Sequence, residues 1–147
     1  MLQIFTKSFS ELNTKELYAI LQLRSEVFVV EQDCVYQDID NKDQKALHII
    51  GYKNNIIVAY ARIFKPGDYF LEASIGRVVV KKNERKYGFG NQIIEASVKA
   101  IETVFKASTI KISAQTYLIK FYNSHEFKQI GNEYLEDDIP HIAMIKK

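Results

Sequence analysis

The chain has 147 residues, 47% of them hydrophobic, with 20 Lys and Arg against 18 Asp and Glu and a net charge of +2. Nine Tyr and nine Phe residues exclude a disordered chain, the near-balanced charge gives no nucleic-acid footprint, and one Cys excludes a disulfide framework. Without an apolar run of about 20 residues or a signal-peptide pattern, we expect one cytoplasmic domain over residues 1–147 that does not contact membranes.

The first third of the chain predicts a strand, a helix and a long loop. Alternating apolar and polar residues predict a strand over 2–9. Asn13, followed three residues later by Glu16, has the spacing of a capping box, and apolar residues at helical spacing continue to Phe28. The pattern stops over 31–45, which we predict to be a polar loop. Loops of this length inside compact domains are often binding loops.

The middle of the chain predicts three strands and a helix. Strands over 47–52 and 56–64 are separated by residues 53–55, which suit a tight hairpin. Residues 74–80 are rich in Val and Ile, as expected for a central strand that is covered on both faces. Apolar periodicity then predicts a helix over 88–105.

The last third alternates short strands with one short helix. We predict strands over 109–114, 127–134 and 139–145, and a helix over 117–123. The complete order β-α-β-β-β-α-β-α-β-β predicts an α/β (α+β) fold, a mixed sheet with helices on both faces.

The segment 78–91 carries the clearest chemical signal. A Val-rich strand enters a basic loop that contains Lys81, Lys82, Arg85 and Lys86, and two glycines, Gly88 and Gly90, open the next helix. Glycines allow a close backbone approach, and the free amides of a helix N-terminus bind phosphate groups. The alternative is a connection whose glycines serve packing alone. The loop fits neither the Walker pattern nor a dinucleotide fingerprint.

At this point the sequence resembles the GNAT superfamily of N-acetyltransferases. Arg85-x-x-Gly88-x-Gly90 is similar to the family's acetyl-CoA motif, and residues 121–127 resemble its Phe-Tyr-x-x-x-Gly-Phe segment. The resemblance implies a mostly antiparallel central sheet flanked by helices, with acetyl-CoA as co-substrate. The residues that it implies for cofactor binding are Val78, Val79, Val80, Arg85, Lys86, Tyr87, Gly88, Phe89, Gly90, Asn91 and Gln115.

Five scattered stretches resemble the ElaA-like branch of that superfamily. They are residues 23–32, 36–40, 75–78, 113–115 and 139–141, so the resemblance covers most of the chain. Three residues depart from the family pattern: Lys82 replaces a usual proline, Lys86 a usual glycine, and Glu126 the glycine of the segment that follows Tyr122.

The resemblance implies a direct attack by a neutral amine on the thioester. It assigns Tyr122 as the general acid that protonates the departing thiolate. For the general base the candidates are Glu31, His48, His141 and a chain of water molecules. Cys34 as a nucleophile has no activating neighbour in the sequence. The three histidines show no metal-ligand spacing, so we expect no metal.

Acceptor-binding residues are expected in the first helix, the long loop and the strand over 74–80. The candidates are Arg24, Phe28, Tyr36 and Arg77. For the arginines the alternative is structural: arginines in buried elements pair with carboxylates, and such a network can hold the long loop in place.

The predicted activity is acetyl-CoA-dependent N-acetyl transfer to a primary amine of an unidentified small molecule or peptide. The alternative is an acyl-CoA-binding sensor without activity. An acyl-homoserine-lactone-synthase-like enzyme has a similar Arg-x-x-Val-Phe run in its first helix, but it fits less well, because those chains are usually longer and lack a clear Arg-x-x-Gly-x-Gly loop. We expect no nucleic-acid partner, and the closing strands are compatible with a homodimer.

Overall fold

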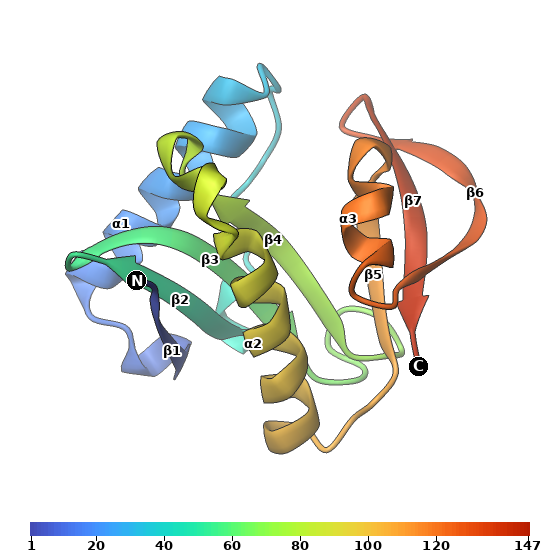
Figure 1. Cartoon of the computed structure of the whole chain (residues 1–147), viewed down its shortest axis with the longest axis horizontal. Helices are drawn as coiled ribbons and strands as arrows, with labels where there is room; N and C mark the ends of the chain where they lie inside the picture. Colours follow the sequence, from blue (N-terminus) through green and yellow to red (C-terminus); the bar gives the residue numbers. More distant parts are fainter.

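The computed structural model describes residues 1–147, and its strands and α-helices follow the predicted order along the chain (Figure 1). The strands are β1 (Gln3–Ser8), β2 (Leu47–Lys53), β3 (Ile56–Phe64), β4 (Ser74–Val80), β5 (Ile110–Gln115), β6 (Lys128–Glu136) and β7 (Ile139–Lys146). The α-helices are α1 (Thr14–Arg24), α2 (Phe89–Val104) and α3 (Ile119–Asn123). A π-helical segment (Ser25–Glu31) continues α1, and a 3₁₀ segment (Lys82–Tyr87) precedes α2.

The capping box and the tight hairpin turn are both found where the sequence predicts them. Asn13 caps α1: its side chain accepts a hydrogen bond from the Glu16 amide at 2.7 Å, and Glu16 accepts one from the Asn13 amide at 3.0 Å. The loop between β2 and β3 consists of Asn54 and Asn55, whose φ angles are 51° and 65°. This left-handed conformation is the one that tight hairpin turns require, and asparagine tolerates it.

The strands form two antiparallel sheets, one ordered β1-β2-β3-β4 and the other β5-β7-β6. A parallel bridge between Ala73 and Ile110 joins them, where the Lys111 amide donates to the Ala73 carbonyl at 2.8 Å. From this joint β4 and β5 separate progressively toward one end of the molecule (Figure 1). The separation leaves one edge of β4 without a neighbouring strand, so its backbone groups are open to a ligand.

Helices α1 and α2 cover opposite faces of the four-stranded sheet. Ile20 and Leu23 of α1 pack with Ile50 and Tyr60 in one buried cluster. The larger cluster places α2, through residues such as Ile93 and Ile94, against the other face and extends to both sheets. Burial of each large apolar side chain contributes about 1.5–3 kcal/mol, which fixes α2 and therefore the loop that precedes it. No helix combines the length and the apolar character that crossing a bilayer requires.

The strand over 74–80 is packed on both faces, as predicted: Ile75 belongs to the larger buried cluster and Val79 to the cluster with α1. Between them Gly76, Arg77 and Val78 are half-buried where β4 leaves β5. One prediction about local structure is wrong. The first helix does not give way to a loop at Glu31: the π-helical segment extends the helical structure through that residue, so the irregular loop begins after it.

Candidate active site

A cleft of about 430 Å³ lies between the free edge of β4 and the N-terminus of α2. It is lined by eight of the residues predicted to bind a cofactor: Val78, Val79, Val80, Arg85, Gly88, Gly90, Asn91 and Gln115. Three predicted residues lie outside its lining. Phe89 is buried in the core, and Lys86 and Tyr87 are on the exposed side of the loop, where the Lys86 ammonium lies 5.4 Å from the Tyr87 ring centroid.

The backbone at the start of α2 has the features of an anion site. Gly88 has φ 74°, a left-handed conformation, and no side chain caps the helix that follows it. A Cβ atom added at Gly90 would lie 3.5 Å from the Phe121 ring, an ordinary van der Waals contact. The amides of the first turn and the positive end of a 16-residue helix therefore face the cleft.

A bulge distorts β4 beside this cleft. Gly76 pairs with Arg62 and Val79 with Tyr60, so Arg77 and Val78 stand opposite a single residue of β3. Arg77 adopts φ 50°, a conformation that costs a non-glycine residue of order 1–3 kcal/mol. Val78, one of the two bulged residues, lines the cleft.

An ion pair crosses the mouth of the cleft. Both terminal nitrogens of Arg85 donate to the carboxylate of Glu31, at 2.6 and 2.8 Å, and Nε donates to the Val80 carbonyl at 3.0 Å. The hydrogen bond from Arg85 lowers the pKa of Glu31. A carboxylate held in this way is a poor proton acceptor, so the geometry does not favour Glu31 as the general base.

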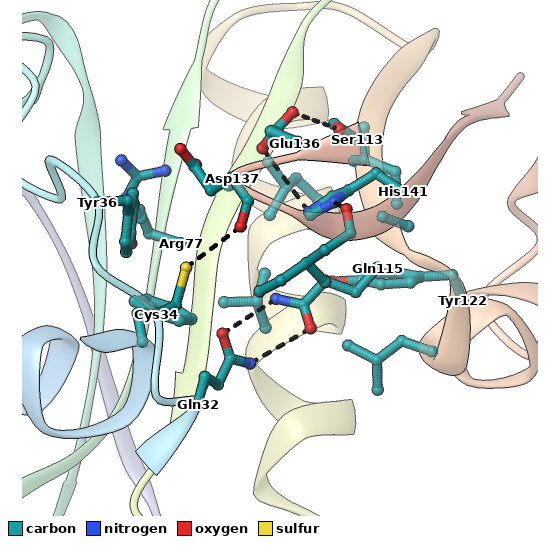
Figure 2. A pocket seen from close by; sticks show the side chains of 18 residues that line it. Gln32, Cys34, Tyr36, Arg77, Ser113, Gln115, Tyr122, Glu136, Asp137 and His141 are labelled. Carbon is teal, nitrogen blue, oxygen red and sulfur yellow. Dashed lines mark hydrogen bonds and ion pairs between the residues drawn. The ribbon is translucent and has the colours of Figure 1, made fainter. Parts of the chain in front are cut away.

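A second cavity, of about 110 Å³, opens on the other side of the gap between the sheets (Figure 2). Its polar residues include Cys34, Tyr36, Arg77, Glu136 and His141. The two cavities meet where β4 and β5 separate, and they share Phe28, Gln32, Val78, Gln115, Leu118 and Tyr122. Two ligands that enter from the two sides can therefore meet at this junction.

Tyr122 lies at the junction and has an unpartnered hydroxyl group. The residue is 7% exposed, and the phenolic oxygen makes no hydrogen bond within the chain. Figure 2 shows its side chain extending from α3 toward Gln115 and His141. Burial raises the pKa of the phenol, which is protonated at neutral pH as an ordinary tyrosine also is.

His141 and Glu136 form a pair in the second cavity. The Nδ1 atom of His141 lies 2.7 Å from the Ile139 carbonyl, so Nδ1 carries the proton and the lone pair of neutral imidazole is on Nε2. Nε2 is 3.7 Å from a carboxylate oxygen of Glu136, whose other oxygen accepts from Ser113 Oγ at 3.1 Å. Glu136 is not among the residues predicted from the sequence.

Arg24 and His48 lie away from both cavities. Arg24 is 1% exposed and pairs with Asp38 (Nε to Oδ2, 3.0 Å) and Asp43 (Nη1 to Oδ1, 2.8 Å). His48 is 1% exposed, with Nδ1 2.6 Å from the Tyr60 hydroxyl and Nε2 3.0 Å from the Asp43 carbonyl. Neither side chain reaches the space where a substrate would bind.

The arginines form the network of ion pairs with carboxylates that the structural alternative predicts. Arg62 pairs with Asp40 at 2.6 Å and with Asp43 at 2.8 Å, and Arg77 pairs with Asp38 at 2.8 Å. With Arg24, three arginines and three aspartates hold the loop over 32–43 against the sheet. Arg77 belongs to this network and also lines the second cavity, together with Phe28 and Tyr36, whose hydroxyl donates to Asp38 at 2.6 Å.

The buried His48 makes the stability of the fold depend on pH. Burial lowers the pKa of its imidazole, so the folded protein keeps it neutral where the unfolded chain already binds a proton. The free energy of unfolding therefore falls as the pH drops below about 6.5, by at most about 1.4 kcal/mol per pH unit, until the pH reaches the lower pKa of the folded state. Urea unfolding at pH 8 and pH 5 measures this loss, which should be smaller in His48→Gln. An equal loss in the two proteins contradicts the assignment.

Two further chemistries to consider are a nucleophilic Cys34 and a metal site, neither of which the sequence predicts. Cys34 Sγ donates to the Asp137 carbonyl at 3.4 Å, and desolvation together with the carboxylates of Asp137 and Asp138 raises the pKa of the thiol. The thiol is therefore protonated at neutral pH, which does not suit a nucleophile. No three His, Cys, Asp or Glu side chains come together in a way that could hold a metal ion.

Comparison with known proteins identifies close relatives. Residues 10–147 match the family model of the acetyltransferase (GNAT) domain. Protein ElaA of Escherichia coli is 42% identical over 94% of this chain and 92% of its own length, and its crystal structure has a TM-score of 0.91 at 39% identity with both chains fully covered. The crystal structure of an acyl-CoA N-acyltransferase from Pseudomonas aeruginosa has a TM-score of 0.94 at 38% identity, again over both complete chains.

A more distant likeness concerns the synthase alternative. The crystal structure of the AHL synthase LasI has a TM-score of 0.79 over 99% of this chain and 89% of that chain, at 12% identity. At this identity the likeness is one of fold alone.

Proposed function

The chain belongs to the acetyltransferase (GNAT) domain family, in its ElaA-like branch, and we propose on this premise that it transfers the acetyl group of acetyl-CoA to a primary amine of a small molecule or peptide. The observation that carries the proposal is the junction of the two cavities at Tyr122. A thioester that enters from one side and an amine that enters from the other meet beside a protonated, unpartnered phenol.

The residues of the larger cleft fit acetyl-CoA, which supplies the activated thioester. The free edge of β4 at Val78–Val80 offers backbone groups to an extended amide-containing arm. The amides after Gly88 and the basic loop before it suit a pyrophosphate. Arg85 lines the same cleft, and anionic groups of the ligand would compete with Glu31 for its guanidinium.

In the proposed reaction, the amine nitrogen bonds to the thioester carbonyl carbon and the carbon–sulfur bond breaks. His141 accepts the amine's proton at Nε2, and Glu136 faces the imidazolium that forms. The main chain of Val78–Val80 supplies hydrogen-bond donors to the carbonyl oxygen. Tyr122 donates its proton to the departing thiolate; afterwards solvent restores that proton and takes up the one that His141 accepted.

The alternative of an inactive acyl-CoA-binding protein arises from Glu126, which replaces a glycine of the family pattern. Glu126 adopts φ 70°, the left-handed conformation that glycine favours. The turn after Tyr122 is therefore kept, with the Phe127 amide donating to the Tyr122 carbonyl at 3.1 Å. The substitution leaves Tyr122 in place at the junction.

Thermal unfolding with and without acetyl-CoA tests the proposal. A ligand at about 100 times its Kd stabilises the fold by about 2.7 kcal/mol, which raises Tm by several degrees. Gly88→Glu should abolish the shift, because it puts a carboxylate where the phosphates are expected. Gly67→Glu is the matched control: Gly67 also has positive φ (93°), and a Cβ atom added there would have no neighbour within 4 Å.

The outcomes separate the two functions. The proposed transferase is supported if acetyl-CoA raises Tm of the wild type and of Gly67→Glu but not of Gly88→Glu. Mass spectrometry should then also detect an acetylated amine. A shift without transfer to any amine supports the inactive binding protein. No shift in the wild type contradicts both.

A further inference from the structure

We propose that the acceptor is a short linear diamine, an alkyl amine that carries a second cationic group a few carbon atoms from the nitrogen that is acetylated. This inference rests on the proposed N-acetyl transfer and assigns the substrate class of the second cavity. Four observations on that cavity carry it: the charge of its lining, two polar atoms without hydrogen-bond partners in the chain, the apolar side chains that contribute to its lining, and its size.

The charged groups of the second cavity leave it negative. Glu136 and Asp137 line it, and neither carboxylate has a Lys or Arg within ion-pairing distance. Arg77 is the one Lys or Arg in the lining, and its charge is already matched by Asp38 at 2.8 Å and Asp40 at 3.4 Å. A cavity with two uncompensated carboxylates attracts a cation.

Two largely buried residues present unpaired polar atoms to this cavity. Tyr122 and His141 are each 7% exposed, and the Tyr122 hydroxyl and the His141 Nε2 atom make no hydrogen bond within the chain. Both residues line the cavity, so these atoms are available to a ligand group. The two atoms suit one amine nitrogen beside a thioester, and they define the reactive end of the cavity (Figure 2).

The carboxylate of Asp137 marks a different part of the same cavity. Asp137 comes from the turn between β6 and β7, and its carbonyl accepts from Cys34 of the long loop at 3.4 Å, whereas Tyr122 comes from α3. Figure 2 shows Asp137 beside Cys34, with Tyr122 on the far side of the cavity, so a cationic group held at Asp137 is separated from an amine held at Tyr122. One molecule that reaches both places needs an amine at one end and a cationic group at the other.

Apolar side chains also contribute to the lining. Phe28, Ile75, Ile112, Ala114, Leu118 and Ile139 belong to it, and they suit contact with methylene groups. The volume of about 110 Å³ limits the acceptor to a short chain. A short alkyl chain with an amine at each end meets all of these conditions.

Steady-state acetylation at fixed acetyl-CoA and fixed pH tests the proposal with three four-carbon amines: 1,4-diaminobutane, 4-amino-1-butanol and butylamine. We expect kcat/KM for the diamine to exceed that for the other two by roughly tenfold or more, because a charge-assisted contact is lost with the neutral ends. Asp137→Asn should raise KM for the diamine by a similar factor and change kcat for the diamine little. Neither constant should change for butylamine.

Asp138→Asn is the matched control. Asp137 and Asp138 are adjacent in the turn and both have positive φ (51° and 62°), a conformation that asparagine tolerates, but Asp138 does not line the cavity. Equal kcat/KM for diamine and butylamine overturns the proposal while leaving N-acetyl transfer intact. A diamine preference that survives Asp137→Asn, or that Asp138→Asn reduces equally, overturns the assigned site. Absence of transfer to any amine contradicts the proposed function itself.

Discussion

Replacing Tyr122 by phenylalanine is expected to lower kcat by about 100-fold and to leave the affinity for acetyl-CoA unchanged. General acid catalysis contributes of this order, and the variant removes only the phenolic oxygen. The aromatic ring keeps its packing, because its neighbours Phe121 and Phe127, with ring centroids at 5.1 and 5.9 Å, contact the ring rather than the hydroxyl. Initial rates at varied acetyl-CoA and amine concentrations separate kcat from the two KM values.

The matched control is Tyr18→Phe, which removes a hydroxyl from an exposed helical tyrosine outside both cavities. Its kcat should equal that of the wild type. A fall in kcat of less than about threefold in Tyr122→Phe would remove Tyr122 from the proton-transfer step. A higher KM for acetyl-CoA with unchanged kcat would assign it a role in binding alone.

Replacing Arg24 by methionine is expected to lower the free energy of unfolding by about 3–5 kcal/mol. The variant removes one partner from each of two buried carboxylates, Asp38 and Asp43, and breaking a buried pair from one side costs this much. The apolar stem of methionine fills most of the space, so the loss reports on charge rather than on a cavity. Urea unfolding followed by circular dichroism measures it.

Arg85→Met supplies the comparison on the surface. Its ion pair with Glu31 is short, but the Arg85 side chain is 42% exposed, and exposed pairs contribute about 0–1 kcal/mol. A loss below about 1 kcal/mol in Arg24→Met, equal to that in Arg85→Met, would show that Arg62 and Arg77, which already pair with Asp43 and Asp38, satisfy these carboxylates without Arg24. Other contacts would then hold the loop over 32–43 in place.

The sequence predicts those parts of the molecule that depend on local chemistry. Gly88 is predicted from its spacing to Gly90, and it adopts the left-handed conformation that makes glycine necessary there. The capping box of Asn13 is equally local. Both signals involve residues within a few positions of each other, so no knowledge of tertiary structure is needed to read them.

Features that depend on distant segments could not be predicted in this way. His48 and His141 both lie on strands. The packing of those strands buries His48 in the core and places His141 at the second cavity. Glu136 reaches His141 because β6 continues beyond Tyr134 to a two-residue turn, which sets Glu136 opposite Ile139. The half-buried state of Arg77 follows from the divergence of two strands, which no local pattern encodes.

The amide pair at the junction of the two cavities has a kinetic consequence. Gln32 and Gln115 each lie within 3.3 Å of the other's amide, on the line where the cleft and the second cavity meet. The two substrates of the proposed reaction enter on opposite sides of this pair. Neither has to pass through the space of the other, so the ternary complex can assemble in either order, and the two products can leave independently.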